Sequence, residues 1–183
     1  MSKNRILGYG AREKSKILFH TLSVGIALII LSSLQVSFFG RFRFFGAVPD
    51  LMLCFVLCIS YFLGPYAGAI TGIASGFVIE AIGSQGISLL PLIYFLYGYC
   101  VGSFSHTSVR KGYAPYILYL VCGLFLRATV TLIYVCLIYK NIQLPVILLY
   151  SVLPEWIVTA VWGCIVYLPM KLFCTWIIRK TKS

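Results

Sequence analysis

Apolar residues form long runs along this chain, and short polar or glycine- and proline-rich breaks separate them. Because a bilayer core about 30 Å thick takes about 20 helical residues, each run can be interpreted as a transmembrane helix. Six runs meet this description: residues 17–39, 45–63, 66–82, 88–104, 115–139 and 144–178. The pattern therefore predicts an all-α integral membrane protein built as a six-helix transmembrane bundle.

The last apolar run is too long for one simple span, and Pro145, Pro154 and Pro169 interrupt it. A proline inside a helix removes a backbone hydrogen bond and bends the axis. We therefore expect a short interfacial helix over residues 145–153, followed by a last span that opens at Pro154. Proline suits the first helical turn, and Glu155 beside it suits the positive end of the helix dipole.

The positive charges predict how these spans are oriented. Residues 1–16 form a basic N-terminal segment, residues 17–178 form a single transmembrane domain, and residues 179–183 form a basic tail. Ten Lys and Arg lie in segments on the side of the two termini, against three on the opposite side. Positive residues concentrate in the cytoplasmic segments of membrane proteins, so we expect both termini to be cytoplasmic.

Composition agrees with a membrane protein. Hydrophobic residues make up 61% of the chain and charged residues 10%, with a mean hydropathy of +0.98, whereas soluble domains carry about a quarter charged residues. A net charge of +11 in a soluble protein would suggest binding to nucleic acid. Here most of the charges lie at the chain ends and in short loops, where they set topology and contact anionic lipid. We expect no nucleic-acid partner.

Candidate catalytic chemistry is sparse. All seven cysteines lie within apolar segments, where a free thiol acts as a small hydrophobic side chain. The two histidines are not spaced as metal ligands, and the chain carries no motif for a serine nucleophile, a metal site or a nucleotide. The sequence therefore predicts a protein that is not an enzyme and that needs neither a cofactor nor a metal.

Glycines recur at every fourth position in the third run, and a matching pair lies in the fourth run. These positions are Gly68, Gly72, Gly76, Gly98 and Gly102. Membrane helices pack closely through faces in which small residues are four positions apart. We expect the third and fourth helices to pack against each other through these faces. Formation of a homodimer, or docking of a foreign helix, is the alternative use of the same glycines.

Among the ionisable residues within or at the ends of the predicted spans, four are candidate structural or interaction contacts: Asp50, Glu80, Arg127 and Glu155. Arg127 is near the middle of its span, where an arginine costs at least about 2.5–3.5 kcal/mol unless it is paired or hydrated. We expect a contact with Glu80 or with Glu155, as a structural clamp in preference to a transport site. Asp50 follows Pro49, and both residues suit the first turn of the second helix.

Taken in order, these features resemble the rod shape-determining protein MreD family. The resemblance rests on Pro49-Asp50, on the glycine ladder ending in Glu80, where this family usually has Asp, and on Gly86, Leu90, Tyr94, Gly98-Tyr99 and Gly102. It implies a non-catalytic protein of the bacterial inner (cytoplasmic) membrane that belongs to the cell-elongation complex. The partners implied are a periplasmic scaffold protein (MreC-like), an actin-like filament (MreB-like) and cell-wall synthases. With them, such a protein organises lateral peptidoglycan synthesis and rod shape.

The glycine-ladder hairpin is also similar to the substrate-binding S-components of energy-coupling-factor vitamin transporters, which have similar length and six spans. That resemblance implies the same bundle and an alternative function as a membrane subunit that binds a vitamin. S-components hold their substrate with polar residues in the outer half of the helices and in loops. This sequence offers few such residues, so the cell-shape interpretation is favoured.

Overall fold

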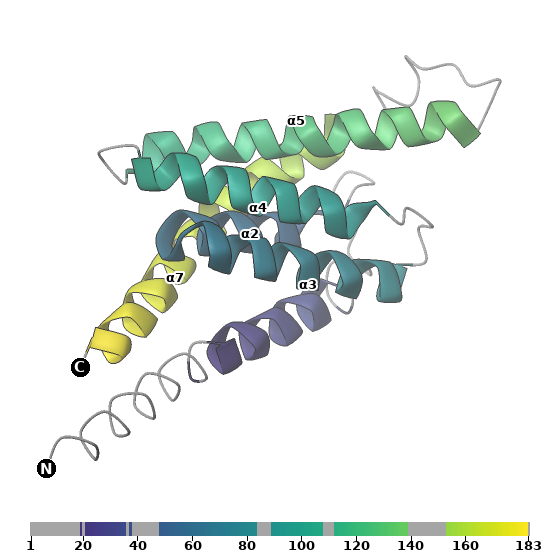
Figure 1. The fold of residues 1–183 in the computed structure, drawn as a ribbon. Coiled ribbons are helices and arrows are strands. Elements are labelled where there is room, and N and C mark those ends of the chain that lie inside the picture. Colours follow the sequence, from purple (N-terminus) through teal and green to yellow (C-terminus); the bar gives the residue numbers. More distant parts are fainter. Residues whose placement is uncertain are drawn as a thin grey trace, which may run out of the picture.

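A computed structural model describes residues 19, 21–35, 37, 48–83, 89–107, 112–138 and 153–182. The regular structure in these residues is entirely helical, so the predicted all-α class is confirmed. The helices are a first helix over Thr21–Leu34, α2 (Leu51–Leu63), α3 (Pro65–Gly83), α4 (Leu90–Thr107), α5 (Tyr113–Ile138) and α7 (Leu153–Lys182) (Figure 1).

A single residue separates α2 from α3. Gly64 has a φ of 102°, in the left-handed region that favours glycine, and its N–H donates to the carbonyl of Ser60 at 3.1 Å. Pro65 then opens α3, where its missing N–H has no intrahelical partner to lose. The chain reverses there, and the predicted break at Gly64-Pro65 is confirmed.

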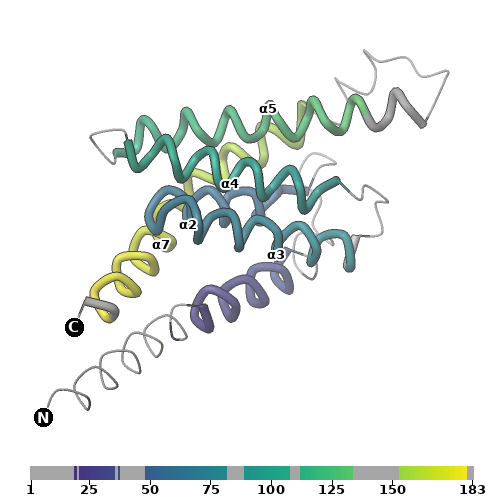
Figure 2. The backbone as a smooth tube through the Cα atoms, in the orientation of Figure 1, coloured from purple at the N-terminus to yellow at the C-terminus, as the bar shows by residue number. Residues whose placement is uncertain are grey.

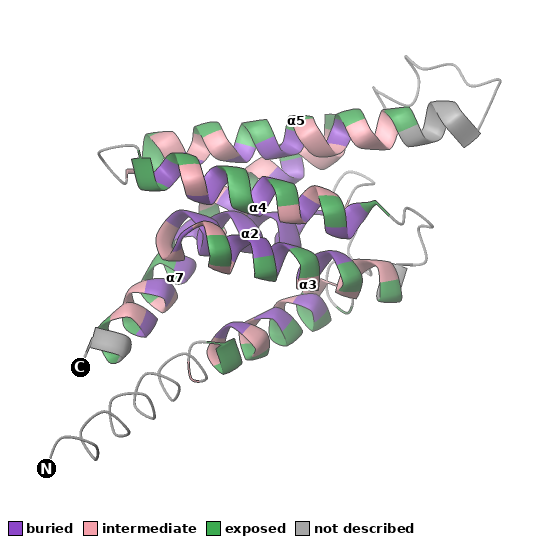
Figure 3. Cartoon of the chain, viewed as in Figure 1, coloured by how far each residue is buried: buried purple, intermediate pink, exposed green. Residues whose placement is uncertain are grey.

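The central element of the bundle is α2. All its residues from Leu51 to Tyr61 are buried, and α3, α4, α5 and α7 pack around it (Figure 3). A helix that is apolar on every side is stable only when its whole surface is covered. The sequence placed the start of this helix at residue 45, but residues 48–50 are not helical and α2 begins at Leu51. The N-cap residue Asp50 explains this later start, because its side chain turns back onto the first turn.

Large apolar side chains cover the outward faces of the bundle. Among those that are at least half exposed are Tyr66, Ile70, Phe77, Leu92, Leu96, Phe104, Leu118, Phe125, Ile157, Val161, Ile165 and Leu172. In a water-soluble bundle these outward positions would be mainly polar or charged. Two helices are also long and apolar enough to cross a bilayer, Tyr113–Ile133 and Leu153–Lys180. Both observations indicate association with a membrane.

The last helix begins where the sequence predicted. Pro154 and Glu155 lie in the first turn of α7, and the helix runs without a break through Pro169 to Lys182. The expected last span from Pro154 to about residue 178 therefore lies within one helix, and Pro169 does not end it. Residues 179–182 of the basic tail continue the same helix. The interfacial helix expected before this point lies outside the described residues, except for Leu153, which belongs to α7. The basic segment 1–16 also lies outside them.

The start of the first helix and the end of α7 lie at the same end of the molecule (Figure 2). The Phe19 and Trp176 rings are in contact there, with 5.8 Å between their centroids. The turn at Gly64 and the start of α5 share this end, because the Tyr61 hydroxyl donates to the carbonyl of Gly112 at 3.0 Å. The opposite end of α2 carries the polar residues that form the candidate site.

Candidate functional site

Polar side chains from four parts of the chain meet at the N-terminal end of α2. They are Asp50 before α2, Tyr94 on α4, Arg127 on α5, and Glu155 and Thr159 on α7. We call these five residues the polar cluster. An α-helix rises 1.5 Å per residue, so the cluster lies about 20 Å from the Gly64 turn, measured along the 13 residues of α2.

Asp50 is the most deeply buried member, with 1% of its side chain exposed. Its Oδ1 accepts the N–H of Leu53 at 3.1 Å, and its own N–H donates to Thr159 Oγ1, also at 3.1 Å. The N–H of Met52 donates to Gln35 Oε1 at 3.2 Å. Because the first N–H groups of a helix have no intrahelical acceptor, these contacts satisfy the buried start of α2.

Arg127 lies between two carboxylates and a tyrosine. Its Nη1 contacts Asp50 Oδ2 and donates to the Tyr94 hydroxyl at 2.8 Å, while Nη2 is 2.9 Å from Glu155 Oε1. The Tyr94 hydroxyl donates in turn to Asp50 Oδ2. A planar guanidinium suits such a site, because its donors point in fixed directions toward several acceptors at once. The side chain of Arg127 is 19% exposed and that of Glu155 is 31% exposed.

The structure selects one of the two partners predicted for Arg127. Glu155 is in contact with it, but Glu80 is not, and among the described residues Glu80 has no ion-pair partner. The reason is the order of the helices in space: α5 packs against α2, α4 and α7, whereas α3, which carries Glu80, packs against α2 and α4. The dipole interpretation of Asp50 was incomplete, because Asp50 is both the cap of α2 and a partner of Arg127.

Two members of the polar cluster, and the neighbouring Gln35, were not identified from the sequence. Tyr94 and Thr159 lie inside apolar runs, where a hydroxyl gives no signal of its own, and Gln35 lies near the end of the first run. Tyr94 was part of the family resemblance, but nothing in the sequence assigned it a contact. The contacts of these three residues depend on which helices become neighbours.

The glycine faces of α3 and α4 are packed against each other, as predicted. A Cβ on Gly72 would overlap the backbone of Tyr94, and one on Gly76 would overlap the backbone of Pro91. Gly68 and Gly98 face each other, since a Cβ on either would meet the carbonyl oxygen of the other. These faces are therefore covered within the chain, and α4 occupies the surface on which a second helix could have docked. Gly102 packs in the same way, against Pro65 at the start of α3.

The opposite end of α2 is held by aromatic residues. Tyr116 lies 4.6 Å from Tyr167 and 6.2 Å from Tyr61, measured between ring centroids, and its hydroxyl donates to the carbonyl of Gly163 at 3.0 Å. Tyr113 also contacts Tyr167, with 5.1 Å between centroids. We call Tyr61, Tyr113, Tyr116 and Tyr167 the aromatic cluster. The bundle is thus tied by polar contacts at both ends of its central helix.

Among the described residues, a small pocket beside the polar cluster has a volume of about 10 Å³, and its lining includes Arg127, Glu155 and Trp156. This is roughly the space for one water molecule, whereas sites for small organic ligands have volumes of about 300–1,000 Å³. In the described residues, every buried side-chain nitrogen or oxygen has a hydrogen-bond partner, and no group of three or more His, Cys, Asp or Glu could hold a metal ion. The contacts of the polar cluster join four parts of the chain.

Comparisons with protein-family models, curated proteins and solved structures find no match to this chain.

Proposed function

We propose that this chain is a non-catalytic, multi-pass protein of the bacterial inner membrane that organises the cell-elongation machinery. One observation carries the proposal: Asp50 and Tyr94, two residues on which the resemblance to the MreD family rests, contact each other and Arg127 in the interior. Residues from separate parts of the resemblance thus cooperate in one structural unit. That unit fixes the positions of four helices and leaves their outward faces for other proteins.

The lengths of α3 and α4 fit membrane crossings in addition to those of α5 and α7. The 19 residues of α3 and the 18 of α4 correspond to about 27–29 Å, close to the thickness of a bilayer core. The outward faces of these helices are apolar. In this arrangement both termini are cytoplasmic and the polar cluster lies in the outer half of the membrane. The short α2 is tolerated because it is surrounded by protein.

The protein would act as a rigid bundle whose outer faces bind its partners. A membrane partner such as a periplasmic scaffold protein (MreC-like) crosses the bilayer and can pack against the apolar outer faces. Because lipid is as apolar as these faces, specific association depends on shape, and shape requires helices at fixed positions. The polar cluster supplies that fixation. The actin-like filament (MreB-like) and the cell-wall synthases are the further components that this platform would bring together.

Depletion of the protein in its host tests this proposal. We expect cells to lose their rod shape, and the incorporation of fluorescent D-amino acids along the lateral wall to become dispersed. Re-expression of the wild-type chain should restore both. Unchanged shape and unchanged lateral incorporation after complete depletion would contradict the proposal.

The vitamin-transporter alternative predicts a different result with the purified protein. A transporter subunit would retain a vitamin and would copurify with ATPase subunits. The chain offers few polar residues of the kind with which S-components hold a substrate, and this disfavours the alternative. A retained vitamin together with associated ATPases, in a strain whose shape does not depend on the protein, would replace the cell-shape proposal with the transporter one.

A further inference from the structure

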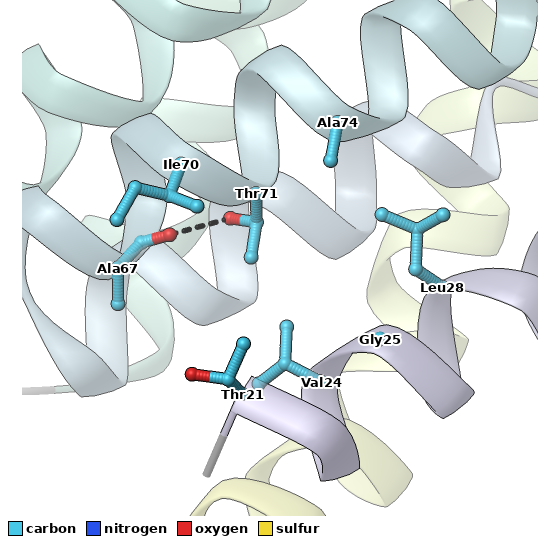
Figure 4. Close-up of a pocket in the computed structure, with 8 residues that line it drawn as sticks. All are labelled: Thr21, Val24, Gly25, Leu28, Ala67, Ile70, Thr71 and Ala74. Carbon is cyan, nitrogen blue, oxygen red and sulfur yellow. Dashed lines mark hydrogen bonds between the residues drawn. The ribbon is translucent and has the colours of Figure 1, made fainter. Parts of the chain in front are cut away.

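An apolar groove lies between the first helix and α3 (Figure 4). Its volume is about 170 Å³. The lining residues are Thr21, Val24, Gly25 and Leu28 from the first helix, and Ala67, Ile70, Thr71 and Ala74 from α3. The two walls run in the same direction, with Thr21 beside Ala67 at one end and Leu28 beside Ala74 at the other (Figure 4). This apolar groove is a separate feature from the polar cluster.

Small side chains keep the groove open. A Cβ built on Gly25 would meet no atom within 4 Å, whereas one on Gly72, which faces α4, would overlap the backbone of Tyr94. The wall offers little polarity, because the Thr71 hydroxyl donates to the carbonyl of Ala67 at 2.8 Å (Figure 4). An apolar cavity of about 150 Å³ stays dry and takes up hydrocarbon. The groove therefore suits a hydrocarbon chain, and it is too small for a helix about 10 Å across.

Positive charge lies at the Thr21 end of the groove. Phe19, half a turn before Thr21, packs on Trp176, and the Lys180 ammonium lies 4.6 Å from the centroid of the Phe19 ring. The same ammonium is 5.1 Å from the Trp176 ring, so two aromatic faces hold it in place. Arg179 is adjacent, and both cationic side chains are exposed. An apolar groove that ends at an exposed pair of cations is complementary to an anionic lipid.

We propose that the apolar groove binds one anionic phospholipid, with an acyl chain between the first helix and α3 and the phosphate beside Lys180 and Arg179. The proposal rests on the membrane placement proposed above, but not on a role in cell shape. Each basic residue near a membrane surface strengthens attraction to anionic lipid about fivefold. The groove supplies the second part of the recognition, since it shelters part of one chain from the surrounding lipid.

Native mass spectrometry of the full chain, delipidated in detergent, tests this site. The probes are phosphatidylglycerol and phosphatidylcholine with the same two oleoyl chains. We expect one phosphatidylglycerol to bind with higher affinity than phosphatidylcholine. Lys180→Gln should weaken binding of phosphatidylglycerol about fivefold and should leave binding of phosphatidylcholine unchanged.

Filling the groove should weaken binding of both lipids. Gly25→Leu places a side chain in the open space, and we expect a loss of about tenfold or more, because two or three methylene groups lose their place in the groove. Ser33→Leu is the matched control, since it adds the same side chain at an exposed position of the same helix outside the groove. Ala74→Leu fills the groove from α3 and serves as a second variant if Gly25→Leu lowers the melting temperature.

Three results would overturn the proposal. They are equal binding of the two lipids by the wild-type chain, unchanged binding in both groove-filling variants of a folded protein, and an equal loss in Ser33→Leu. If the groove retains no lipid and the groove-filling substitutions abolish self-association, the groove binds a second copy of the chain instead. Because the readout is lipid binding, these outcomes are independent of the cell-shape experiment.

Discussion

Arg127 is the residue at the centre of the polar contacts in the interior. Its guanidinium contacts Asp50 and Glu155 at once and accounts for both ion pairs between described residues. A buried pair contributes little net stability relative to an apolar replacement, but removing one partner leaves a buried charge without compensation. We therefore expect the polar cluster to determine which helices pack together. Substitutions of its residues should have non-additive effects on the free energy of unfolding.

Replacement of Arg127 tests this coupling. We expect Arg127→Leu to lower the free energy of unfolding by about 3–5 kcal/mol, because the buried Asp50 carboxylate loses its cation. Arg127→Leu combined with Asp50→Asn should cost less than the sum of the two single changes. Equilibrium unfolding in detergent measures all three variants. Arg179→Leu, at an exposed position on α7, is the control, and strict additivity in the double variant would contradict the clamp.

Substitutions of Glu155 and Glu80 should have different effects on the free energy of unfolding. Glu155→Gln removes the charge that faces Arg127 Nη2 and should cost about 1–3 kcal/mol of unfolding free energy. Glu80→Gln should change it by less than about 0.5 kcal/mol, since Glu80 is only partly buried and has no ion pair among the described residues. The same unfolding experiment compares them. Equal losses in the two variants would mean that Glu80 has a role that its surroundings do not reveal.

At the scale of elements, the α3–α4 pair is the most closely packed part of the bundle. Gly68, Gly72 and Gly76 allow the two backbones to approach, and this part of the fold could be derived from the spacing of residues alone. The four-residue period of small side chains is a local property, so it is visible in the sequence before any partner is known. The start of α2 was less evident, because one acceptor at its first turn, Gln35, comes from the first helix and reaches the Met52 N–H only after the chain has folded.

A methyl group added to this interface should force the helices apart. We expect Gly72→Ala to lower the free energy of unfolding by about 1–3 kcal/mol, because the Cβ meets the backbone of Tyr94 and neither helix can yield locally. Gly25→Ala is the matched control at a helical glycine with open space around it. That variant should instead gain up to about 1 kcal/mol from helix propensity. Equal effects at the two sites would argue against close α3–α4 packing.

At the scale of the whole molecule, α2 is the axis around which the other helices are arranged. The aromatic cluster holds one end of this helix and the polar cluster holds the other, about 20 Å away. Between them the interior is filled by apolar side chains, while equally apolar side chains face outward. The interior and the outward faces of the molecule are therefore similarly apolar. We attribute the fixed arrangement of the helices around α2 to the polar contacts at its two ends.

Fusion reporters test the proposed arrangement in the membrane. Green fluorescent protein fused to either terminus should fluoresce, because both termini are expected in the cytoplasm. Alkaline phosphatase inserted between α3 and α4 should be active, since that connection is expected on the periplasmic side. Inactive phosphatase at this position, or a dark fusion at one terminus with normal expression, would contradict six crossings with this orientation.

The sequence alone determined the features that depend on neighbours along the chain. Apolar runs set the helices, Gly64-Pro65 set the turn between α2 and α3, and the glycine period set the face on which α3 meets α4. Tertiary structure decided the pairing of charges. Arg127 could have met Glu80 or Glu155, and it reaches Glu155 and Asp50 because α5 lies beside α7 and α2. Helix propensity and periodicity act over a few residues, whereas an ion pair acts through space and depends on which helices pack side by side.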